Sequence, residues 1–373
     1  MKTSLKEFQQ HCLKHHIPFV SYSLPGESIP ITLFSEVKNI RIFKSILDVD
    51  CNSGFILSPF QSERKPVIVI PDNGKETGWH INLKEFPKPP DIYQKPTLDN
   101  DPDEISFHKY SLQIERIKKS LASGEAKKVV LSRTKVLNNI DSMQLPDVFK
   151  ELVNLYTHAF AYLIYTPESG IWLGATPEVL LQVDKRSFST MALAGTQEFL
   201  DNVEDKKWTD KELREHDYVA DYVRKKLSLG GYQYTERAIE TVRAGNVKHL
   251  RTIFDGNINE TKADWKELVT LLYPTPAICG TENEATLQLI QKIEVHKREY
   301  YAGIIGPFSH ESKTDLFINL RCMKVMDNSA VLFAGGGILD ESAPLLEWEE
   351  TEMKFNTLIR VVQKVKERLK VSE

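Results

Sequence analysis

Acidic and basic residues recur at helical spacing late in the chain, in the segment "GGGILDESAPLLEWEETEMK" from Gly335 to Lys354. Glu347, Glu350 and Lys354 stand at positions i, i+3 and i+7, so on a helix they share one face. Two carboxylates one helical turn apart offer the oxygen ligands that Mg²⁺ prefers. The same spacing also suits a solvated face with intrahelical ion pairs, so the pattern alone leaves both interpretations open.

A second acidic stripe lies in "DKELREHDYVADYVRKKL", where Glu212 and Glu215 are followed at helical spacing by Val219 and Val223. Carboxylates that continue an apolar stripe are costly to bury unless they are paired or bound to a metal. If this helix faced the last one, its glutamates could complete an oxygen cage around a cation. Ordinary ion pairing is the alternative.

Two further residues could transfer protons. Lys128 opens the apolar run "KVVLSR", where desolvation would favour the neutral amine that can act as a base; alternatively, the lysine lies at a strand edge and reaches water. Glu178, in "GATPEVLL", could be a general acid. The alternative is a helix start, with Thr176 as the N-cap, Pro177 first in the helix, and Glu178 favoured by the helix dipole.

Two features could hold an anion. Gly335, Gly336 and Gly337 follow the apolar run "AVLFA" and could present backbone N–H groups, although the pattern is neither a Walker loop nor a dinucleotide fingerprint. Arg321, in the expected strand "FINLRCMKV", could grip a carboxylate through two hydrogen bonds. Taken together, the candidate groups suit a small polycarboxylate substrate and a divalent cation.

The elements that must position these groups follow from periodicity and from turn residues. We expect helices at Ser106–Ser123 (closed by Gly124), Asp210–Leu227, Ala263–Leu272, Ala285–Lys297 and roughly Leu345–Leu369. We expect strands at Lys127–Leu137, Ala159–Thr166, Ala302–Phe308, Asp315–Val325 and Ala330–Ala334. Helices and strands follow each other in mixed order rather than in strict alternation, which favours an α+β fold.

Composition limits the possible functions. The chain has 373 residues, 41% hydrophobic and 27% charged, which is an ordinary globular mixture. The net charge of −4 and the lack of a basic stripe argue against a nucleic-acid surface. There is no run of 18 apolar residues, no signal peptide and no Cys-x-x-Cys pair, so we expect a cytoplasmic protein. The Pro-rich segment Phe86–Glu104 is typical of an extended linker.

The order of several motifs resembles that of the chorismate-utilising enzymes, which include isochorismate synthase, salicylate synthase, anthranilate synthase component I and aminodeoxychorismate synthase component I. The motifs are "KVVLSR", "GATPEVLL", "LAGT", "REH", "YPTPAICG", "YYAGIIG", "INLRCMKV", "AGGGI" and "EWEETEMK", between about Ser106 and Leu369. The resemblance implies one large α+β domain with two packed antiparallel β-sheets surrounded by helices. Residues 1–104 would be a variable N-terminal part with a Pro-rich crossing loop, and residues 105–373 the chorismate-binding catalytic region.

The resemblance also implies roles for individual residues. Lys128 matches the base that activates water, and Glu178 matches the general acid that protonates the departing hydroxyl. Glu215, Glu347 and Glu350 match the ligands of Mg²⁺, the implied cofactor. The positions that match substrate-binding residues are Gly195, Thr196, His249, Ala277, Tyr301, Arg321, Gly335, Gly337 and Lys354.

Three positions favour one activity within the family. The amine-transferring enzymes lack a lysine at position 128, and Ala194 stands where aminodeoxychorismate synthase typically has one. Ala277 stands where the amine-transferring and salicylate enzymes usually have threonine. We therefore expect an isochorismate synthase, with salicylate synthase, which goes on to eliminate pyruvate, as the alternative. Tyr273, where histidine is common, and Gln197, where arginine is frequent, depart from the family pattern.

The resemblance implies chorismate as the small-molecule substrate and a product that enters menaquinone or siderophore biosynthesis. We expect a monomer with no glutaminase subunit, no nucleic acid and no membrane as a partner. Two hypotheses of other classes remain. One is a non-catalytic binding protein on the same scaffold, and the other is amine transfer with a glutaminase partner.

Overall fold

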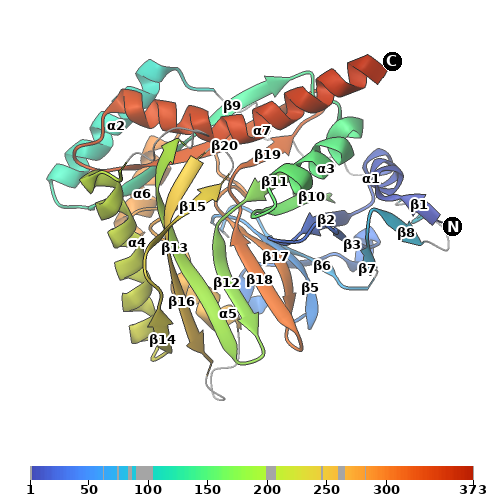
Figure 1. Ribbon diagram of the computed structural model, residues 1–373, viewed down its shortest axis with the longest axis horizontal. Helices are drawn as coiled ribbons and strands as arrows, with labels where there is room; N and C mark the ends of the chain where they lie inside the picture. Colours follow the sequence, from blue (N-terminus) through green and yellow to red (C-terminus); the bar gives the residue numbers. More distant parts are fainter. Residues whose placement is uncertain are drawn as a thin grey trace.

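Two large antiparallel β-sheets form the centre of the computed structural model (Figure 1). The structure describes residues 2–61, 63–73, 75–82, 86–89, 104–198, 207–244, 247–258, 265–281 and 283–372. Most of the expected linker Phe86–Glu104 thus lies outside the described residues. The architecture confirms the expected α+β fold of two packed sheets with helices outside.

The first sheet has eight strands. Their spatial order is β7 (Lys75–Thr77), β3 (Ile31–Phe34), β2 (Phe19–Ser23), β10 (Phe160–Thr166), β11 (Gly170–Thr176), β19 (Cys322–Val325), β20 (Ser329–Ile338) and β9 (Val129–Asn138). The register of the last pair sets Val130 opposite Gly337 and Ser132 opposite Gly335. The glycine run therefore lies beside the start of β9, where Lys128 is found.

The second sheet has ten strands. Their order is β14 (Gln233–Glu236), β16 (Val247–Asn257), β13 (Ser187–Glu198), β12 (Val179–Asp184), β18 (Lys313–Ile318), β17 (Ile304–Ser309), β5 (Ser53–Ser58), β6 (Val67–Pro71) and β4 (Arg41–Phe43), with β15 (Glu240–Ala244) also paired to β16. A separate pair joins β1 (Lys2–Ser4) to β8 (His80–Asn82). Because β2 pairs with β10 and β5 with β17, the N-terminal part of the chain contributes strands to both large sheets.

Aromatic side chains fill the space between the two sheets. The ring of Phe160 on β10 stacks on Phe317 of β18, with centroids 4.3 Å apart, and lies 6.2 Å from Phe55 on β5. A second core cluster, which includes Leu152, Leu163 and Leu358, packs helices against the outer face of the eight-stranded sheet. Burial of this apolar area is the main stabilising contribution and gives the site rigid walls.

The helices lie outside these sheets. They are α1 (Leu5–Lys14), α2 (Phe107–Ala122), α3 (Leu145–Leu155), α4 (Asp210–Leu229), α5 (Trp265–Leu272), α6 (Asn283–Ile293) and α7 (Pro344–Ser372). Figure 1 shows α7 running along one edge of the molecule over β20, and α4 standing beside β13. The expected helices are confirmed within the described residues, except that α6 ends at Ile293 rather than Lys297; the first two residues of the expected helix Ala263–Leu272 lie outside the described residues. None of the described helices is long and apolar enough to cross a membrane.

Two predictions of local structure are wrong. Residues 315–325 do not form one strand, because the chain leaves one sheet at Ile318 and enters the other at Cys322. Buried Asn319 fixes this crossing, since its side chain donates to Tyr300 O at 2.9 Å and accepts from the Tyr162 hydroxyl at 2.6 Å. Arg321 at the crossing has φ +47°, so it belongs to neither strand.

The segment "GATPEVLL" does not start a helix either. β11 ends at Thr176 and β12 begins at Val179, so Glu178 lies in a tight connection between two strands. The Thr176 hydroxyl donates to Ile318 O at 2.6 Å and accepts from the Glu178 amide at 3.3 Å. Pairing of the following apolar residues with β18 outweighs the local helix-start signal, as tertiary contacts often do.

Candidate active site

One cavity collects most of the predicted site residues, although they come from both sheets and two helices. It is lined by Glu178, Gly195, Thr196, Glu215, His249, Ala277, Tyr301, Arg321, Gly335, Gly337 and Lys354, among others. Glu215 comes from α4 and Lys354 from α7. Gly195 and Thr196 face it where the pairing of β13 with β16 shifts register, an irregularity that redirects side chains.

Lys128 does not line this cavity itself but lies immediately before β9, next to the lining residue Glu215. Its side chain is fully buried, and its ammonium lies 3.0 Å from Glu215 Oε1. The contact is an ion pair without hydrogen-bond geometry, and the part of the chain that the structure describes offers the nitrogen no hydrogen-bond acceptor. The interpretation of Lys128 as a strand-edge lysine in contact with water is therefore wrong. Among the described residues, the carboxylate that pairs with this ammonium is that of Glu215.

Glu178 has the properties of a proton donor. Its side chain is buried, and its backbone is fixed by a bond from the Ile318 amide to Glu178 O at 3.0 Å. Burial raises the pKa of the Glu178 carboxyl to about 7, with nearby cations, Lys128 first among them, opposing the shift. A substantial fraction of the carboxyl is thus protonated near neutral pH, as a general acid requires.

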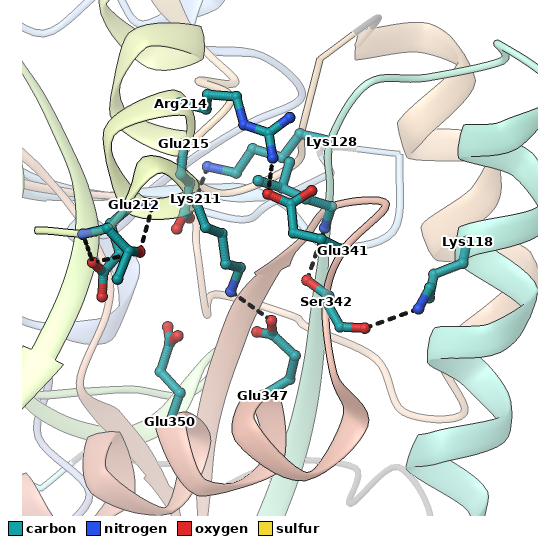
Figure 2. Close-up of polar contacts among 12 residues, drawn as sticks. Lys118, Lys128, Lys211, Glu212, Arg214, Glu215, Glu341, Ser342, Glu347 and Glu350 are labelled. Carbon is teal, nitrogen blue, oxygen red and sulfur yellow. Dashed lines mark hydrogen bonds and ion pairs between the residues drawn. The ribbon is translucent and has the colours of Figure 1, made fainter.

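The three predicted metal ligands face one another from two helices. Figure 2 shows Glu347 and Glu350 on α7 pointing toward the start of α4, from which Lys211 reaches down and on which Glu215 lies farther back. Each carboxylate has a lysine partner. The pairs are Lys128–Glu215 at 3.0 Å, Lys211–Glu347 at 2.6 Å and Lys354–Glu350 at 2.6 Å. Across the described ranges, no three His, Cys, Asp or Glu side chains form a ready-made cation site.

The chemistry of these carboxylates nevertheless fits a divalent cation. Glu347 Oε2 is buried and has no hydrogen-bond partner among the residues that the structure describes. Burial, and then the charge of Glu350, raise the pKa of Glu347 to about 7. Burial acts on Glu350 in the same direction, but the Lys354 ammonium holds the pKa of that carboxyl below its usual value. A hard cation that prefers oxygen would satisfy the free atom and relieve the repulsion between the two carboxylates.

The glycine run makes room for these carboxylates. A Cβ atom at Gly337 would lie 2.3 Å from Glu215 Oε1 and 2.8 Å from Lys128 Cε. A Cβ atom at Gly336 would lie 3.2 Å from Glu347 Oε2. The absence of side chains at these positions of β20 therefore lets α4 and α7 bring their acidic groups against the strand.

Arg321 and His249 form a fixed pair on the cavity wall. The Arg321 guanidinium donates to Thr357 Oγ1 at 2.9 Å and lies 3.3 Å from His249 Nε2. Burial, followed by the charge of Arg321, lowers the pKa of His249 to about 3, so the imidazole is neutral. Because Nδ1 lies 2.8 Å from Gly195 O, which can only accept, Nδ1 carries the proton and Nε2 accepts from Arg321.

Lys354 connects the glycine run of β20 to the acidic cluster. Its ammonium donates to Gly335 O at 2.7 Å and to Glu350 Oε1 at 2.6 Å. The Tyr301 ring stacks on Phe333, with centroids 5.3 Å apart, so its hydroxyl is held near the same strand. Lys354 thus lies beside the glycine backbone, and Arg321 is a second cation that lines the same cavity.

Reasoning from the sequence missed Lys211, whose i, i+4 spacing to Glu215 was the available signal. Glu212 does not join the acidic cluster, because it caps α4 and accepts from Thr209 N at 2.7 Å and from Gln197 Nε2 at 2.7 Å. Two other acidic residues near the start of α7 lie outside the cluster, and of these Glu349 is exposed. Glu352 is not, since it pairs with Arg133 and Lys135 at 2.6 Å each.

The turn that leads from β20 into α7 is tied to both neighbouring helices. Arg214 of α4 forms an ion pair with Glu341, and Lys118 of α2 donates to Ser342 O at 3.0 Å (Figure 2). The Ser342 hydroxyl accepts from the Leu339 amide at 3.0 Å. These contacts fix the point from which α7 carries Glu347 into the cluster.

Comparisons with known proteins agree on the family. Residues 76–363 match a family model described as chorismate binding enzyme. Isochorismate synthase EntC of Escherichia coli (strain K12) is 29% identical over 268 residues, which are 70% of this chain and 68% of that protein. Anthranilate synthase component 1 of Pseudomonas putida is 28% identical over 265 residues, which are 68% of this chain and 52% of that protein.

A solved structure shows the same fold. The isochorismate synthase DhbC from Bacillus anthracis superposes with a TM-score of 0.77 at 24% identity, over 96% of this chain and 100% of that chain. The identities to EntC and to anthranilate synthase differ by one percentage point. Sequence identity alone therefore does not separate the two reactions, and individual residues of the cavity must do so.

Proposed function

The chain belongs to the chorismate-binding enzyme family, and from that premise we propose that it is an isochorismate synthase. The single observation that supports this most is that one site holds both a candidate base and a candidate acid. A fully buried lysine, Lys128, is paired with Glu215, which lines the same cavity as Glu178, a carboxyl whose burial raises its pKa to about 7. An enzyme that adds water to one carbon and removes a hydroxyl from another needs such a base and such an acid.

The reaction is balanced without any other reactant. Water attacks C2 of the chorismate ring while Lys128, as the neutral amine, takes its proton, the ring double bonds shift, and the C4 hydroxyl departs. Glu178 donates a proton to that hydroxyl, so one water enters and one leaves. The buried positions of both groups exclude bulk water, which strengthens their electrostatic interactions with the ring.

The substrate carries two carboxylates, and the site offers a separate place for each. Arg321, Tyr301 and the backbone of Gly335 and Gly337 would bind the pyruvyl carboxylate. Neutral His249 keeps the Arg321 guanidinium oriented, and a planar guanidinium suits a carboxylate well. This division leaves the ring carboxylate to the acidic cluster between α4 and α7.

Glu215, Glu347 and Glu350 would hold Mg²⁺ at that cluster. The ion would anchor and polarise the ring carboxylate. The lysines that now neutralise the three glutamates keep these side chains compatible with burial. The metal assignment depends on the unsatisfied Glu347 oxygen and on the glycines that admit the carboxylates to β20.

Residues in the cavity favour this reaction over those of related enzymes. Amine transfer uses ammonia and needs no base for water, yet Lys128 is buried in place here. Ala277 lines the cavity without a hydroxyl group, whereas the resemblance associates pyruvate elimination with threonine. Isochorismate is thus the expected final product, and it would enter menaquinone or siderophore biosynthesis.

Product identification tests the proposal. The purified protein would be incubated with chorismate and Mg²⁺, and the products separated by chromatography, with fluorescence to detect salicylate. Isochorismate as the accumulating product is the expected result. Salicylate would favour the salicylate synthase alternative, and an aromatic amine formed only with ammonia would favour amine transfer. Binding of chorismate without turnover would indicate a non-catalytic protein.

A further inference from the structure

Arg298 is a buried arginine that lies outside the catalytic cavity. Its side chain connects two walls of that cavity. Its guanidinium donates to Val130 O at 2.8 Å and to Ile278 O at 2.7 Å. Both Val130 and Ile278 line the cavity. Val130 lies two residues after Lys128, and Ile278 directly follows Ala277. One side chain thus bridges the strand that carries the base and the loop that faces the ring.

The loop Thr275–Thr281 depends on this strand for its position. The Val130 amide donates to Cys279 O at 3.0 Å, and the Thr281 amide donates to Lys128 O at 3.0 Å. Gly280, at φ +116°, permits the close approach, because a Cβ atom there would lie 2.0 Å from Lys128 O. These backbone bonds join the loop and the strand at one end, and the Arg298 bridge joins them beside Ala277.

A buried anion holds the bridge in place. The Glu294 carboxylate accepts from Arg298 at 2.6 and 2.9 Å and from the Ser132 amide and hydroxyl at 2.7 and 2.8 Å. His296 Nε2 lies 2.9 Å from the same hydroxyl. The side chains of Glu294, His296 and Arg298 are each 3% exposed. Such a fully bonded buried pair is rigid, and it is anchored to β9 itself.

We propose that Arg298 is a positioning residue for the reaction: it sets the separation between Lys128 and the wall formed by Ala277. The role rests on the proposed function, because that function makes Lys128 the base that must face C2 of the ring. Arg298 acts through backbone carbonyls and does not contact the substrate. Without it, two buried carbonyls lose their donor and the loop can move away from β9.

The arginine is also reachable from outside, which permits a chemical test. Arg298, Glu294 and His296 line a second cavity of about 320 Å³, whose rim includes the exposed residues Arg64 and Lys297. A small cation can therefore enter the space that Arg298→Ala would vacate. Guanidinium carries its donors on three coplanar nitrogens and can reach acceptors that lie apart, whereas the three N–H donors of methylammonium share one nitrogen and cannot span the two carbonyls.

The first experiment uses Arg298→Lys, which keeps the charge beside Glu294 but cannot reach both carbonyls. We expect kcat to fall by about 100-fold, since a small displacement of a catalytic group has that effect. KM for chorismate should change by less than about threefold, because Arg321 and Lys354 are untouched. The melting temperature is measured in parallel, so that turnover is compared only between folded proteins.

The second experiment uses Arg298→Ala with millimolar guanidinium, which should raise kcat by at least about tenfold. Methylammonium should not raise it, and guanidinium should not restore Lys128→Ala, which lacks the base. A folded Arg298→Lys enzyme with nearly wild-type kcat would overturn the proposal. So would failure of both variants to fold, because Arg298 would then be needed for folding alone. A wild-type enzyme that forms no isochorismate would instead contradict the proposed function.

Discussion

The Lys128 ammonium lies 3.0 Å from the Glu215 carboxylate, and the lysine side chain is fully buried. The proposed base for water and a proposed ligand of Mg²⁺ therefore neutralise each other when no cation is present. Removal of either partner leaves a buried charge without its counter-ion, which costs more than the pair itself contributes. Stability and catalysis are thus linked at this one contact, and they can be separated by combining two substitutions.

Lys128→Met should lower isochorismate formation by about 10²–10⁴-fold, the usual contribution of a positioned base. In a metal-free buffer it should also reduce the free energy of unfolding by about 3 kcal/mol, because Glu215 loses its partner. The double variant Lys128→Met/Glu215→Gln should recover most of that stability and none of the activity. Denaturant unfolding and a product assay on the three proteins measure both effects. Equal stability of the single and double variants would contradict the coupling.

Glu178→Gln should abolish most turnover and change the dependence of stability on pH. The folded carboxyl has a pKa of about 7, above that of an unfolded glutamate, so the native state binds more protons between these values. Its contribution to stability is therefore complete below the unfolded pKa and is lost as pH rises to about 7. The variant should be more stable than the wild type above pH 7, by about 3 kcal/mol at most.

The same pKa predicts the pH profile of the wild-type enzyme. A general acid works in its protonated form, so kcat/KM should fall as pH rises through about 7. Measurements of kcat/KM at saturating Mg²⁺ across this range would detect the fall. A profile that stays flat from pH 6 to about 9 would argue against Glu178 as the acid.

Glu347→Gln should raise the Mg²⁺ concentration needed for half-maximal activity by more than about tenfold, since a carboxylate ligand is lost. Glu349→Gln is the matched control, because Glu349 lies on the exposed side of the same helix and should leave that concentration unchanged. Calorimetric titration with Mg²⁺ gives a second measurement that does not depend on turnover. Equal Mg²⁺ affinity of the two variants would rule out the metal assignment.

Spacing within one element was readable in advance, but contacts between distant elements were not. The shared face of Glu347, Glu350 and Lys354 follows from helix geometry alone. Helix geometry alone does not show that Glu215 joins the cluster while Glu212 does not. That difference arises because Glu212 caps α4. The partners of Lys128 were equally hidden, since α4 meets β9 and β20 only after the sheets have packed.

Local signals also misled where tertiary pairing decided the structure. Thr176 and Pro177 are typical of a helix start, yet the next residues pair with β18 and leave Glu178 between two strands. The run around Arg321 alternates like one strand, yet the buried amide of Asn319 fixes a crossing between sheets there. In both cases the departure from regular structure places a functional side chain in the cavity.

The origin of the oxygen at C2 tests the central claim most directly. Chorismate would be converted in water enriched in oxygen-18 with Mg²⁺ present, and the product analysed by chromatography and mass spectrometry. The account predicts isochorismate that carries one heavy oxygen, located at C2, because Lys128 activates a solvent water. Isochorismate without the label, or a different product altogether, would contradict it.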